Sequence, residues 1–380
     1  VLSKVKLTEG VMKILMIAPG NSIHSKRPLD LLLENGCDVT FVDSVNPYPE
    51  GRDRYQFLPY PSPRGMSYYK MLGESITGRL LFWSVVLQLW LLWRRIRPDV
   101  VHVHWVDYRA YHCVMARLRP LVLSVWGTDI NQYYLPGADL EKLSTIRKVL
   151  AKADLVIVDA PIMSSKCAHL AKREIHTELL HLGVDTKVFR SGYRDAVFEW
   201  KHRLAIPPDT KVLFSMRAFD QRYNHHIILD AFAQAQPRFK TNVILIFKTY
   251  NQKYYSSSVE YEIHMCRRAE ELGIAGSLRW MEEVPFEQLP EIYALADGII
   301  NYPSLDTLPV TFLEAAACER LVVTSRLPSY LGTFAERYFL MVDPGNITDL
   351  ADALVKVVND DAATQRAALM AEARKVVEKE

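Results

Sequence analysis

The chain has 380 residues, enough for two ordinary domains of ~150–200 residues each. Apolar residues make up 49% of it and the formal net charge is only +2, so nothing in the composition draws the whole molecule to nucleic acid or to a membrane. The five cysteines are far apart and include no C-x-x-C pair, which disfavours a zinc site and a disulfide framework, and a cytoplasmic protein is expected.

In the first half, strand-like apolar runs alternate with helical stretches, the order that parallel α/β layers produce. Strands are expected at Lys13–Ala18, Val39–Val42, Val100–His104, Leu121–Trp126, Leu155–Val158 and Thr177–Leu182. Helices are expected at Arg27–Glu34, Thr77–Arg95 and Leu140–Lys152.

The most apolar of these stretches, Leu80 to Trp93, has only Ser84 and Gln88 as polar members. It is shorter than the ~20 apolar residues that a membrane-spanning helix needs, so a helix buried against a sheet is expected. The alternative is a peripheral contact with the inner face of the membrane through residues 79–97. Tryptophans would then lie at the interface and arginines on lipid phosphates.

The second half repeats the scheme, with strands expected at Lys211–Met216, Val243–Lys248, Leu278–Met281, Gly298–Asn301, Leu321–Thr324 and Phe339–Val342. Helices are expected at His226–Ala235, Val259–Leu272, Phe286–Leu295 and Thr311–Cys318. A charged segment with Gly and Pro suggests a linker over 191–208 between domains 1–190 and 209–360, with a C-terminal helix over 361–380. The predicted fold class is α/β, with two doubly wound parallel sheets that bind ligands at the carboxyl ends of their strands.

The most informative segment follows the strand Gly298–Asn301 and leads into a helix. Asp306 and Glu314 lie eight positions apart across this turn. The free N–H groups and dipole of the first helical turn favour an anion such as a diphosphate. Carboxylates beside a phosphate repel it unless they bind other groups of the same ligand, such as sugar hydroxyls. The segment therefore predicts a nucleotide-sugar site.

Two arginines follow the first strand of the second half. Arg217 comes directly after that strand and Arg222 lies five residues further on. Guanidinium groups bind phosphate oxygens in pairs and stabilise negative charge that grows on a leaving phosphate. Taken alone, the two arginines would be weak evidence, because surface arginines are common.

Together with Asp306 and Glu314, these arginines resemble the family-4 glycosyltransferases of the GT-B fold. That family has an arginine and a lysine after the first strand of its second domain, and later two glutamates separated by seven residues. The segment 183–189 also looks like the family's signature before the linker. The resemblance implies two Rossmann-like domains facing across a cleft. It also implies retaining transfer of a sugar from a nucleotide-diphosphate sugar to an acceptor hydroxyl, with no metal and no other cofactor.

The resemblance also implies roles for single residues. Arg217 and Arg222 would hold the diphosphate, Glu314 the ribose hydroxyls and Asp306 the transferred sugar, so that Arg217, Arg222 and Asp306 are the catalytic candidates. Further donor contacts are expected from Gly20, Asn21, Lys248, Met281, Val284, Thr307 and Leu308. Two residues depart from the family pattern. Arg222 replaces a lysine, which keeps the charge but changes its geometry, and Asp306 replaces a glutamate, which indicates an altered fit for the sugar.

Cleft or acceptor contacts are expected from His24, His104, Trp126 and Asp129. Trp126 stands where many family members have a histidine, and stacking on a sugar or packing in the cleft wall are equally consistent with it. Asp129 is expected to cap the following helix. Because His102 and His104 alternate along a strand, at most one of them is expected to face the cleft.

Three other functions are alternatives to this prediction. A sugar-nucleotide epimerase or hydrolase has the same fold, and a non-catalytic nucleotide- or glycan-binding protein has the same binding groups. A dinucleotide oxidoreductase would need Gly-x-Gly-x-x-Gly after the first strand, where this chain has only Pro19-Gly20-Asn21. The nucleotide stays open, as does the acceptor, which is a carbohydrate, a lipid-linked group or a small molecule.

Overall fold

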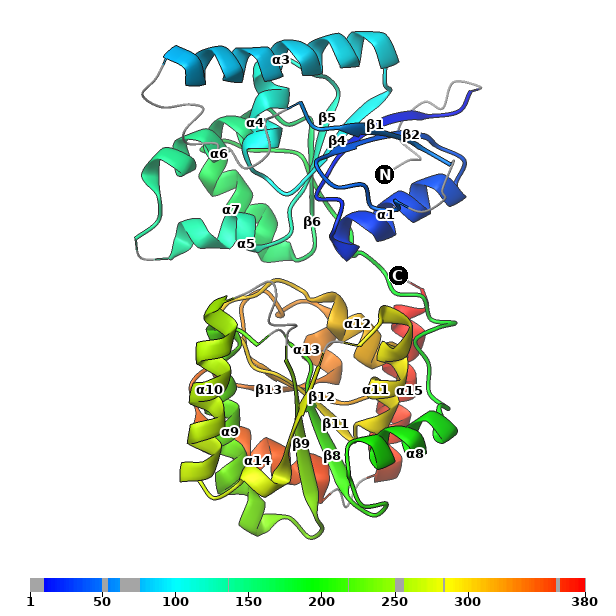
Figure 1. Cartoon of the computed structure of the whole chain (residues 1–380), viewed down its shortest axis with the longest axis vertical. Helices are drawn as coiled ribbons and strands as arrows, with labels where there is room; N and C mark the ends of the chain where they lie inside the picture. Colours follow the sequence, from blue (N-terminus) through cyan, green and yellow to red (C-terminus); the bar gives the residue numbers. More distant parts are fainter. Residues whose placement is uncertain are drawn as a thin grey trace. The chain divides into compact units, whose positions relative to one another are not determined.

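The structure is a computed structural model that describes residues 10–49, 54–61, 76–135, 137–217, 219–249, 256–282, 284–359 and 363–379. It divides into two compact units, residues 1–182 and 183–380, each with its own parallel sheet (Figure 1). The two sheets confirm the predicted fold class.

Unit 1 is built on seven parallel strands in the order β3-β2-β1-β4-β5-β6-β7. Their bounds are β1 (Lys13–Ile17), β2 (Asp38–Asp43), β3 (Gln56–Pro59), β4 (Val100–His104), β5 (Leu121–Ser124), β6 (Leu155–Val158) and β7 (Thr177–Leu179). The strand β1 pairs with β2 on one side and β4 on the other, so the chain order reverses at β1. In doubly wound sheets, ligands bind beyond the carboxyl ends of the strands at such a reversal.

Helices cover both faces of the unit 1 sheet: α1 (Ile23–Glu34), α3 (Ile76–Ile96), α4 (Tyr108–Met115), α5 (Thr128–Asn131), α6 (Leu140–Lys152) and α7 (Pro161–Ala171). The β1 side chains alternate between two cores, because successive residues of a strand point to opposite faces. Leu15 and Ile17 pack in the core that includes α3, α4, α6 and α7. Ile14 and Met16 pack in the core that includes Leu29 of α1.

Unit 2 has six parallel strands in the order β10-β9-β8-β11-β12-β13. Their bounds are β8 (Lys211–Ser215), β9 (Val243–Lys248), β10 (Leu278–Met281), β11 (Gly298–Asn301), β12 (Val322–Ser325) and β13 (Leu340–Val342). The chain order reverses at β8, which pairs with β9 and β11. The carboxyl ends of β8 and β11 are therefore the expected ligand position in this unit.

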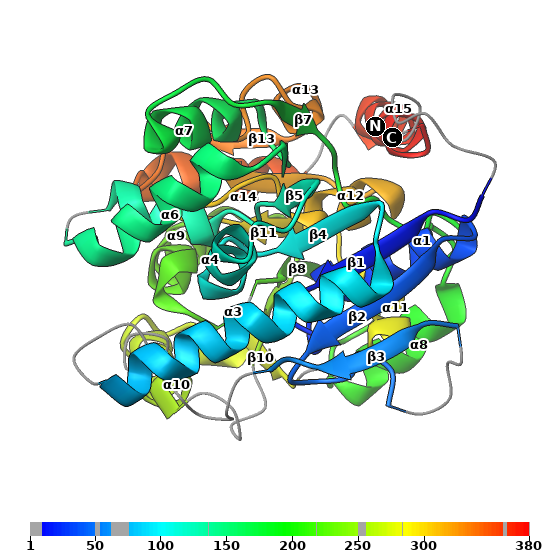
Figure 2. The same cartoon turned by 90° about the horizontal axis from the view of Figure 1, so that it is seen from above.

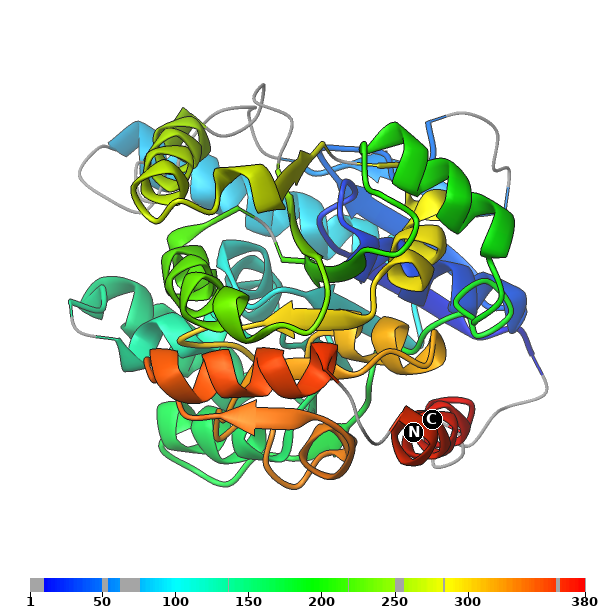
Figure 3. The same cartoon turned by 90° about the horizontal axis from the view of Figure 1, so that it is seen from below.

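The helices of unit 2 form a layer on each face of its sheet (Figure 1). One layer contains α9 (His225–Ala235), α10 (Ser256–Glu271) and α14 (Ile347–Val358). The other contains α8 (Arg194–Arg203), α11 (Leu289–Leu295), α12 (Val310–Ala317), α13 (Phe334–Tyr338) and α15 (Ala363–Val377). The C-terminal α15, red in Figure 3, packs against α12 and α13, and its Arg374 donates to the carbonyl oxygen of Thr186 at 2.9 Å.

The segment expected to be a linker, 191–208, contains α8. This helix buries Trp200 and packs against α11, and Trp200 Nε1 donates to Glu291 of α11 at 2.8 Å. The boundary between the units lies earlier than expected, between Leu182 and Gly183. This charged helix is attached to unit 2 through Trp200, together with Ala196 and Val197, which pack against the same core.

An unpaired buried histidine in unit 2 makes stability depend on pH. His225 is fully buried among Phe219, Phe247 and Tyr261, and this burial lowers its pKa to about 3. In the unfolded chain the imidazole titrates near ~6.5. The folded-state pKa is the lower one, so stability is lost as the pH falls below the unfolded value.

The variant His225→Phe is therefore expected to lose less stability on acidification than the wild type. The difference should be about 2 kcal/mol between pH 7 and pH 5, from the two pKa values. Denaturant unfolding at both pH values measures it. His202→Phe is the control, because it removes an exposed histidine of the same unit without changing this core. Equal pH dependence in His225→Phe and wild type would contradict the prediction.

Candidate active site

Two of the three predicted catalytic residues, Arg217 and Asp306, form a largely buried ion pair where the chain order of the unit 2 sheet reverses. Arg217 follows β8 and Asp306 follows the neighbouring β11, and Arg217 Nη2 lies 3.2 Å from Asp306 Oδ2. Both side chains are 14% exposed. Burial alone would lower the pKa of Arg217, but the charge of Asp306 raises it above its ordinary value, so the guanidinium stays charged.

Two tyrosines hold this pair in place. Arg217 Nη2 donates to the Tyr223 hydroxyl at 2.7 Å, and its guanidinium lies 4.3 Å from the centre of the Tyr223 ring. Tyr330 donates to Asp306 Oδ2 at 3.1 Å and accepts from Asn301 at 3.2 Å. Burial raises the pKa of Tyr330 well above its ordinary value, so it remains a donor. Burial also raises the pKa of Asp306, while Arg217 acts in the opposite direction.

The second residue predicted to bind phosphate, Arg222, is more exposed than Arg217 and pairs with a different carboxylate, that of Asp220. Its Nε and Nη2 donate to Asp220 at 2.9 and 3.0 Å, a two-bond contact with one planar group. Arg222 is 58% exposed, and the backbone N–H of Ser304 donates to its carbonyl oxygen at 3.1 Å. The arginines that the sequence assigned to a diphosphate are therefore both paired with aspartates in this structure.

The predicted ribose ligand, Glu314, lies in the second turn of α12 and is buried. Tyr293 of α11 donates to Glu314 Oε2 at 2.8 Å. Burial, and next the charge of Glu314, raises the pKa of Tyr293 well above its ordinary value, so this hydroxyl stays protonated. The tyrosine fixes the carboxylate near the start of α12, where the helix dipole favours negative charge.

The remaining donor candidates of unit 2 lie at strand ends or in the turn before α12. Thr307 donates its backbone N–H to Asp306 Oδ1 at 3.0 Å, and both Thr307 and Leu308 are buried. Lys248 and Met281 end the neighbouring strands β9 and β10, and Val284 follows β10. Met281 is buried in the core, and its carbonyl oxygen accepts from Thr249 at 2.7 Å. Contacts of these residues with a donor stay predictions.

In unit 1, three of the predicted cleft residues lie together beyond the strand ends. His24, in the first turn of α1, has its ring 5.0 Å from that of Trp126, which follows β5. His104 ends β4, with its ring 6.3 Å from Trp126, and Trp105 meets Trp126 edge-on at 5.3 Å. His24, His104, Trp105 and Trp126 are called the aromatic group below. Both ring nitrogens of His104 and Nε1 of Trp126 are buried without a hydrogen-bond partner.

Two predictions about this region were wrong. His102 and His104 lie on the same face of β4, with ring centres 4.1 Å apart, because residues two positions apart on a strand point the same way. Burial lowers the pKa of His102 to about 4, and that of His104 well below its ordinary value, so both are neutral.

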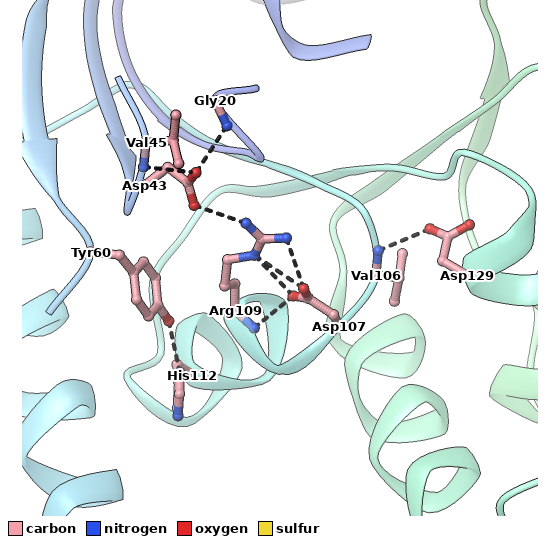
Figure 4. Close-up of polar contacts among 9 residues, drawn as sticks. All are labelled: Gly20, Asp43, Val45, Tyr60, Val106, Asp107, Arg109, His112 and Asp129. Carbon is pink, nitrogen blue, oxygen red and sulfur yellow. Dashed lines mark hydrogen bonds and ion pairs between the residues drawn. The ribbon is translucent and has the colours of Figure 1, made fainter. Parts of the chain in front are cut away.

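The second wrong prediction concerned Asp129. It does not cap α5, whose N-cap is Gly127 at φ 103°, a backbone conformation that favours glycine. Asp129 instead accepts from the backbone N–H groups of Val106 at 2.9 Å and Trp126 at 3.1 Å (Figure 4 shows the first). It thereby joins the segments that follow β4 and β5. Burial raises the pKa of Asp129 to about 7, while these backbone hydrogen bonds act in the opposite direction.

Sequence reasoning missed a buried ion network at the carboxyl edge of unit 1 (Figure 4). Arg109, near the start of α4, lies 3.0 Å from Asp43 at the end of β2 and 2.9 Å from Asp107. Asp107 is the N-cap of α4. Asp43 also accepts from the N–H groups of Gly20 at 2.9 Å and Val45 at 3.2 Å. The network joins the ends of β1, β2 and β4.

The predicted phosphate-binding loop of unit 1 is held in place by contacts within the unit. The N–H of Gly20 donates to Asp43, and a Cβ at Gly20 would lie 1.8 Å from the carbonyl oxygen of Val45. Only glycine allows the two backbones to approach so closely. Asn21, the next residue, is exposed. Contact of either residue with a phosphate stays a prediction.

Comparisons with known proteins agree with this geometry. One family model, described as glycosyl transferase 4-like, matches residues 13–160, and a second, described as glycosyl transferases group 1, matches residues 197–376. Between them, the two models match most of the chain, and both describe glycosyltransferases. The match of the second model covers Arg217, Arg222, Asp306 and Glu314, on which the resemblance was based.

Among curated relatives of this chain, a D-inositol 3-phosphate glycosyltransferase of Corynebacterium urealyticum is 27% identical over 221 residues. That alignment covers 57% of this chain and 51% of the relative, so the chain spans about half the length of the curated relative. Two solved structures have the same GT-B fold over 97% of this chain at 16% identity. They are Anabaena HepE with UDP (TM-score 0.73, 95% covered) and sucrose-phosphate synthase of Thermosynechococcus elongatus (0.76, 94%).

The partners of the candidate site residues could be predicted from the sequence to different degrees. Asp220 lies two positions before Arg222, so a local signal for that pair was present. Tyr293 and Tyr330 lie 21 and 24 positions from their carboxylates, and nothing in the sequence links them. Among the residues that the structure describes, no group of three or more His, Cys, Asp or Glu is placed to hold a metal ion.

Proposed function

We propose that the protein is a retaining glycosyltransferase that moves a sugar from a nucleotide-diphosphate sugar to an acceptor hydroxyl. One observation is central to this proposal. Arg217, Asp306 and Glu314 lie around the carboxyl ends of β8 and β11, where the chain order of the unit 2 sheet reverses. A cation for the diphosphate and two carboxylates for hydroxyls are the groups that such a donor requires.

In this proposal the diphosphate of the donor replaces the aspartates as the partner of each arginine. A diphosphate attracts Arg217 and Arg222, and Asp306 and Asp220 give way because a bidentate phosphate contact replaces each ion pair. Asp306 then accepts from hydroxyls of the transferred sugar, and Tyr330 keeps it in place. Glu314, fixed by Tyr293, accepts from the ribose hydroxyls.

Catalysis then depends mainly on charge and position. When the bond between the sugar and the diphosphate breaks, its electron pair goes to the leaving phosphate, and negative charge grows there. A buried guanidinium such as Arg217 stabilises this charge more than it stabilises the ground state. The acceptor hydroxyl attacks the same face of the sugar and passes its proton to the leaving phosphate. The step needs no metal, because the arginines neutralise the phosphate.

For the donor nucleotide we propose UDP, and for the acceptor a carbohydrate, free or lipid-linked. The Anabaena relative in fold is described in complex with UDP and with UDP-glucose, which makes a UDP-sugar the first donor to test. The aromatic group of unit 1 includes the partly exposed ring of Trp126, on which a sugar can stack. A cytoplasmic location is part of the proposal, because nucleotide sugars are made there.

Glu314→Gln is expected to weaken UDP binding about tenfold to a hundredfold, because hydrogen bonds to a charged group exceed neutral ones. The amide oxygen can still accept from Tyr293, so the fold should be retained. Thermal shift measured against UDP, GDP, ADP, CDP and dTDP reports the affinity, since a ligand that binds only the folded state stabilises it.

Glu291→Gln is the matched control, because Glu291 is a carboxylate of the same unit that accepts from Trp200 and has no role in the proposal. Its UDP affinity should equal that of the wild type. A wild type that no nucleoside diphosphate stabilises would contradict the proposal. So would release of free or epimerised sugar from the donor at the transfer rate when no acceptor is present.

A further inference from the structure

The helix α3 exposes an apolar stripe along its whole length. Its large exposed apolar residues are Ile76, Leu80, Trp83, Leu87 and Leu91. At ~100° per residue these five side chains fall within an arc of roughly 80°. Trp83, Leu87 and Leu91 are each more than half exposed, although such residues are usually at least partly covered. The stripe is therefore a surface without a partner inside the described part of the chain.

The opposite face of α3 is part of the unit 1 core. Phe82, Val85, Val86 and Leu89 are buried and pack with residues of α4 and of the sheet. Figures 1 and 2 show α3 lying along the outside of its unit beside α4. The helix has 21 residues rather than the 14 of the apolar run, and by length and composition alone it is long enough to cross a membrane. Because one face is packed, it is placed to lie on a membrane instead.

The charged residues of α3 are all positive. The α3 sequence contains no Asp or Glu, whereas Arg79, Arg94 and Arg95 lie on it and Arg97 follows it. All four arginines are exposed, and none forms an ion pair with any residue that the structure describes. The chain as a whole has a net charge of only +2, so this concentration is local. A surface with phosphate groups would complement it.

Tryptophans add a preference for the boundary between water and lipid. Trp83, Trp90 and Trp93 line a groove with Met115 and Arg117 beside the stripe. The Arg94 guanidinium lies 5.0 Å from the Trp90 ring. Indole rings with nearby arginines are typical of helices that lie in the headgroup region of a bilayer.

We propose that the outer face of α3 docks on an anionic lipid bilayer and holds the protein at the membrane surface. The apolar stripe enters the boundary between headgroups and acyl chains, and the arginines contact lipid phosphates. A second copy of the chain fits less well. Two α3 helices packed antiparallel would place Arg79 of one copy near Arg94 and Arg95 of the other, and like charges repel. This proposal does not depend on the transferase activity.

Flotation of the full chain with lipid vesicles tests the proposal. The wild type should bind vesicles of phosphatidylcholine with about 30 mol% phosphatidylglycerol, and bind pure phosphatidylcholine far more weakly. The double variant Leu87→Glu/Leu91→Glu should bind the anionic vesicles at least tenfold more weakly, because two apolar side chains no longer leave water. Replacing Arg94 and Arg95 by glutamine should weaken binding to anionic vesicles by about fivefold per residue and leave binding to pure phosphatidylcholine unchanged.

The control is Leu140→Glu/Ile263→Glu, which alters two exposed apolar residues outside α3 and should bind vesicles as the wild type does. Because all these positions are exposed, thermal unfolding should be similar in every variant. Equal binding by the α3 variant and the control would overturn the proposal, as would a wild type that does not bind anionic vesicles. Sedimentation tests whether the stripe binds a second copy instead. If the wild type is a dimer and Leu87→Glu/Leu91→Glu is a monomer, the stripe is a dimer interface and the proposal is overturned.

Discussion

Replacing Arg217 by alanine is expected to lower kcat/KM for sugar transfer by about 10²–10³-fold, the effect of removing one preorganised group that stabilises developing charge. Arg217 is the better placed of the two arginines, because it is 14% exposed whereas Arg222 is 58% exposed. A buried guanidinium is screened less by water, so its interaction with the leaving phosphate is stronger. Steady-state kinetics in which the UDP-sugar concentration is varied at a fixed, saturating acceptor concentration would measure the loss.

The difficulty with this variant is that it leaves Asp306 buried without its cation, which destabilises the folded state as well. Arg217→Lys separates the two effects. Lysine keeps the charge beside Asp306 but loses the planar fork, so stability should be largely retained while kcat falls. Arg238→Ala is the control, because Arg238 pairs with Asp352 on the surface and should leave turnover unchanged. Turnover of folded Arg217→Ala close to that of the wild type would contradict the assignment.

The strands were predictable because parallel strands that are buried on both faces are continuous apolar runs. The run Val243–Lys248, for example, is β9 with the predicted bounds. The edge strand β3 (Gln56–Pro59) was missed, since it is only half-buried and ends in proline. The helix α1 was expected to begin at Arg27, whereas it begins four residues earlier, at Ile23. Ser22 is the N-cap of this helix, and its hydroxyl oxygen accepts from the backbone N–H of His24. Pro28 lies inside the helix.

The site was predictable where it depends on the position of a residue after a strand. Arg217 and Asp306 follow neighbouring parallel strands, so the topology alone places them close together. Their contacts depend instead on tertiary packing. Tyr330 contacts Asp306 from the segment between β12 and α13. The periodicity of apolar residues in strands and helices carries no information about such a contact. The same holds in unit 1, where Asp43 and Arg109 are 66 positions apart.

Arg109→Met is expected to reduce the free energy of unfolding by about 3–5 kcal/mol, because it leaves the carboxylates of Asp43 and Asp107 buried without a cation. Burial alone would lower the pKa of Arg109, but Asp107 raises it above its ordinary value, so the guanidinium is charged in the folded protein. The network fixes the ends of β1, β2 and β4, which position the loop of Gly20. Denaturant unfolding of the full chain at neutral pH measures the loss.

Two comparisons decide whether buried charge is the cause. Arg119→Met removes the partner of Asp154 in an ion pair whose side chains are 46% and 41% exposed, so it should cost less than about 1 kcal/mol. Burial raises the folded-state pKa of Asp107 above 3.8, so its ionisation costs stability as the pH rises. Without Arg109 that cost is larger, and the deficit of Arg109→Met should therefore shrink when the pH is lowered from about 7 to about 5. A deficit that does not change with pH would mean that the methylene stem of Arg109 matters through packing, and not its charge.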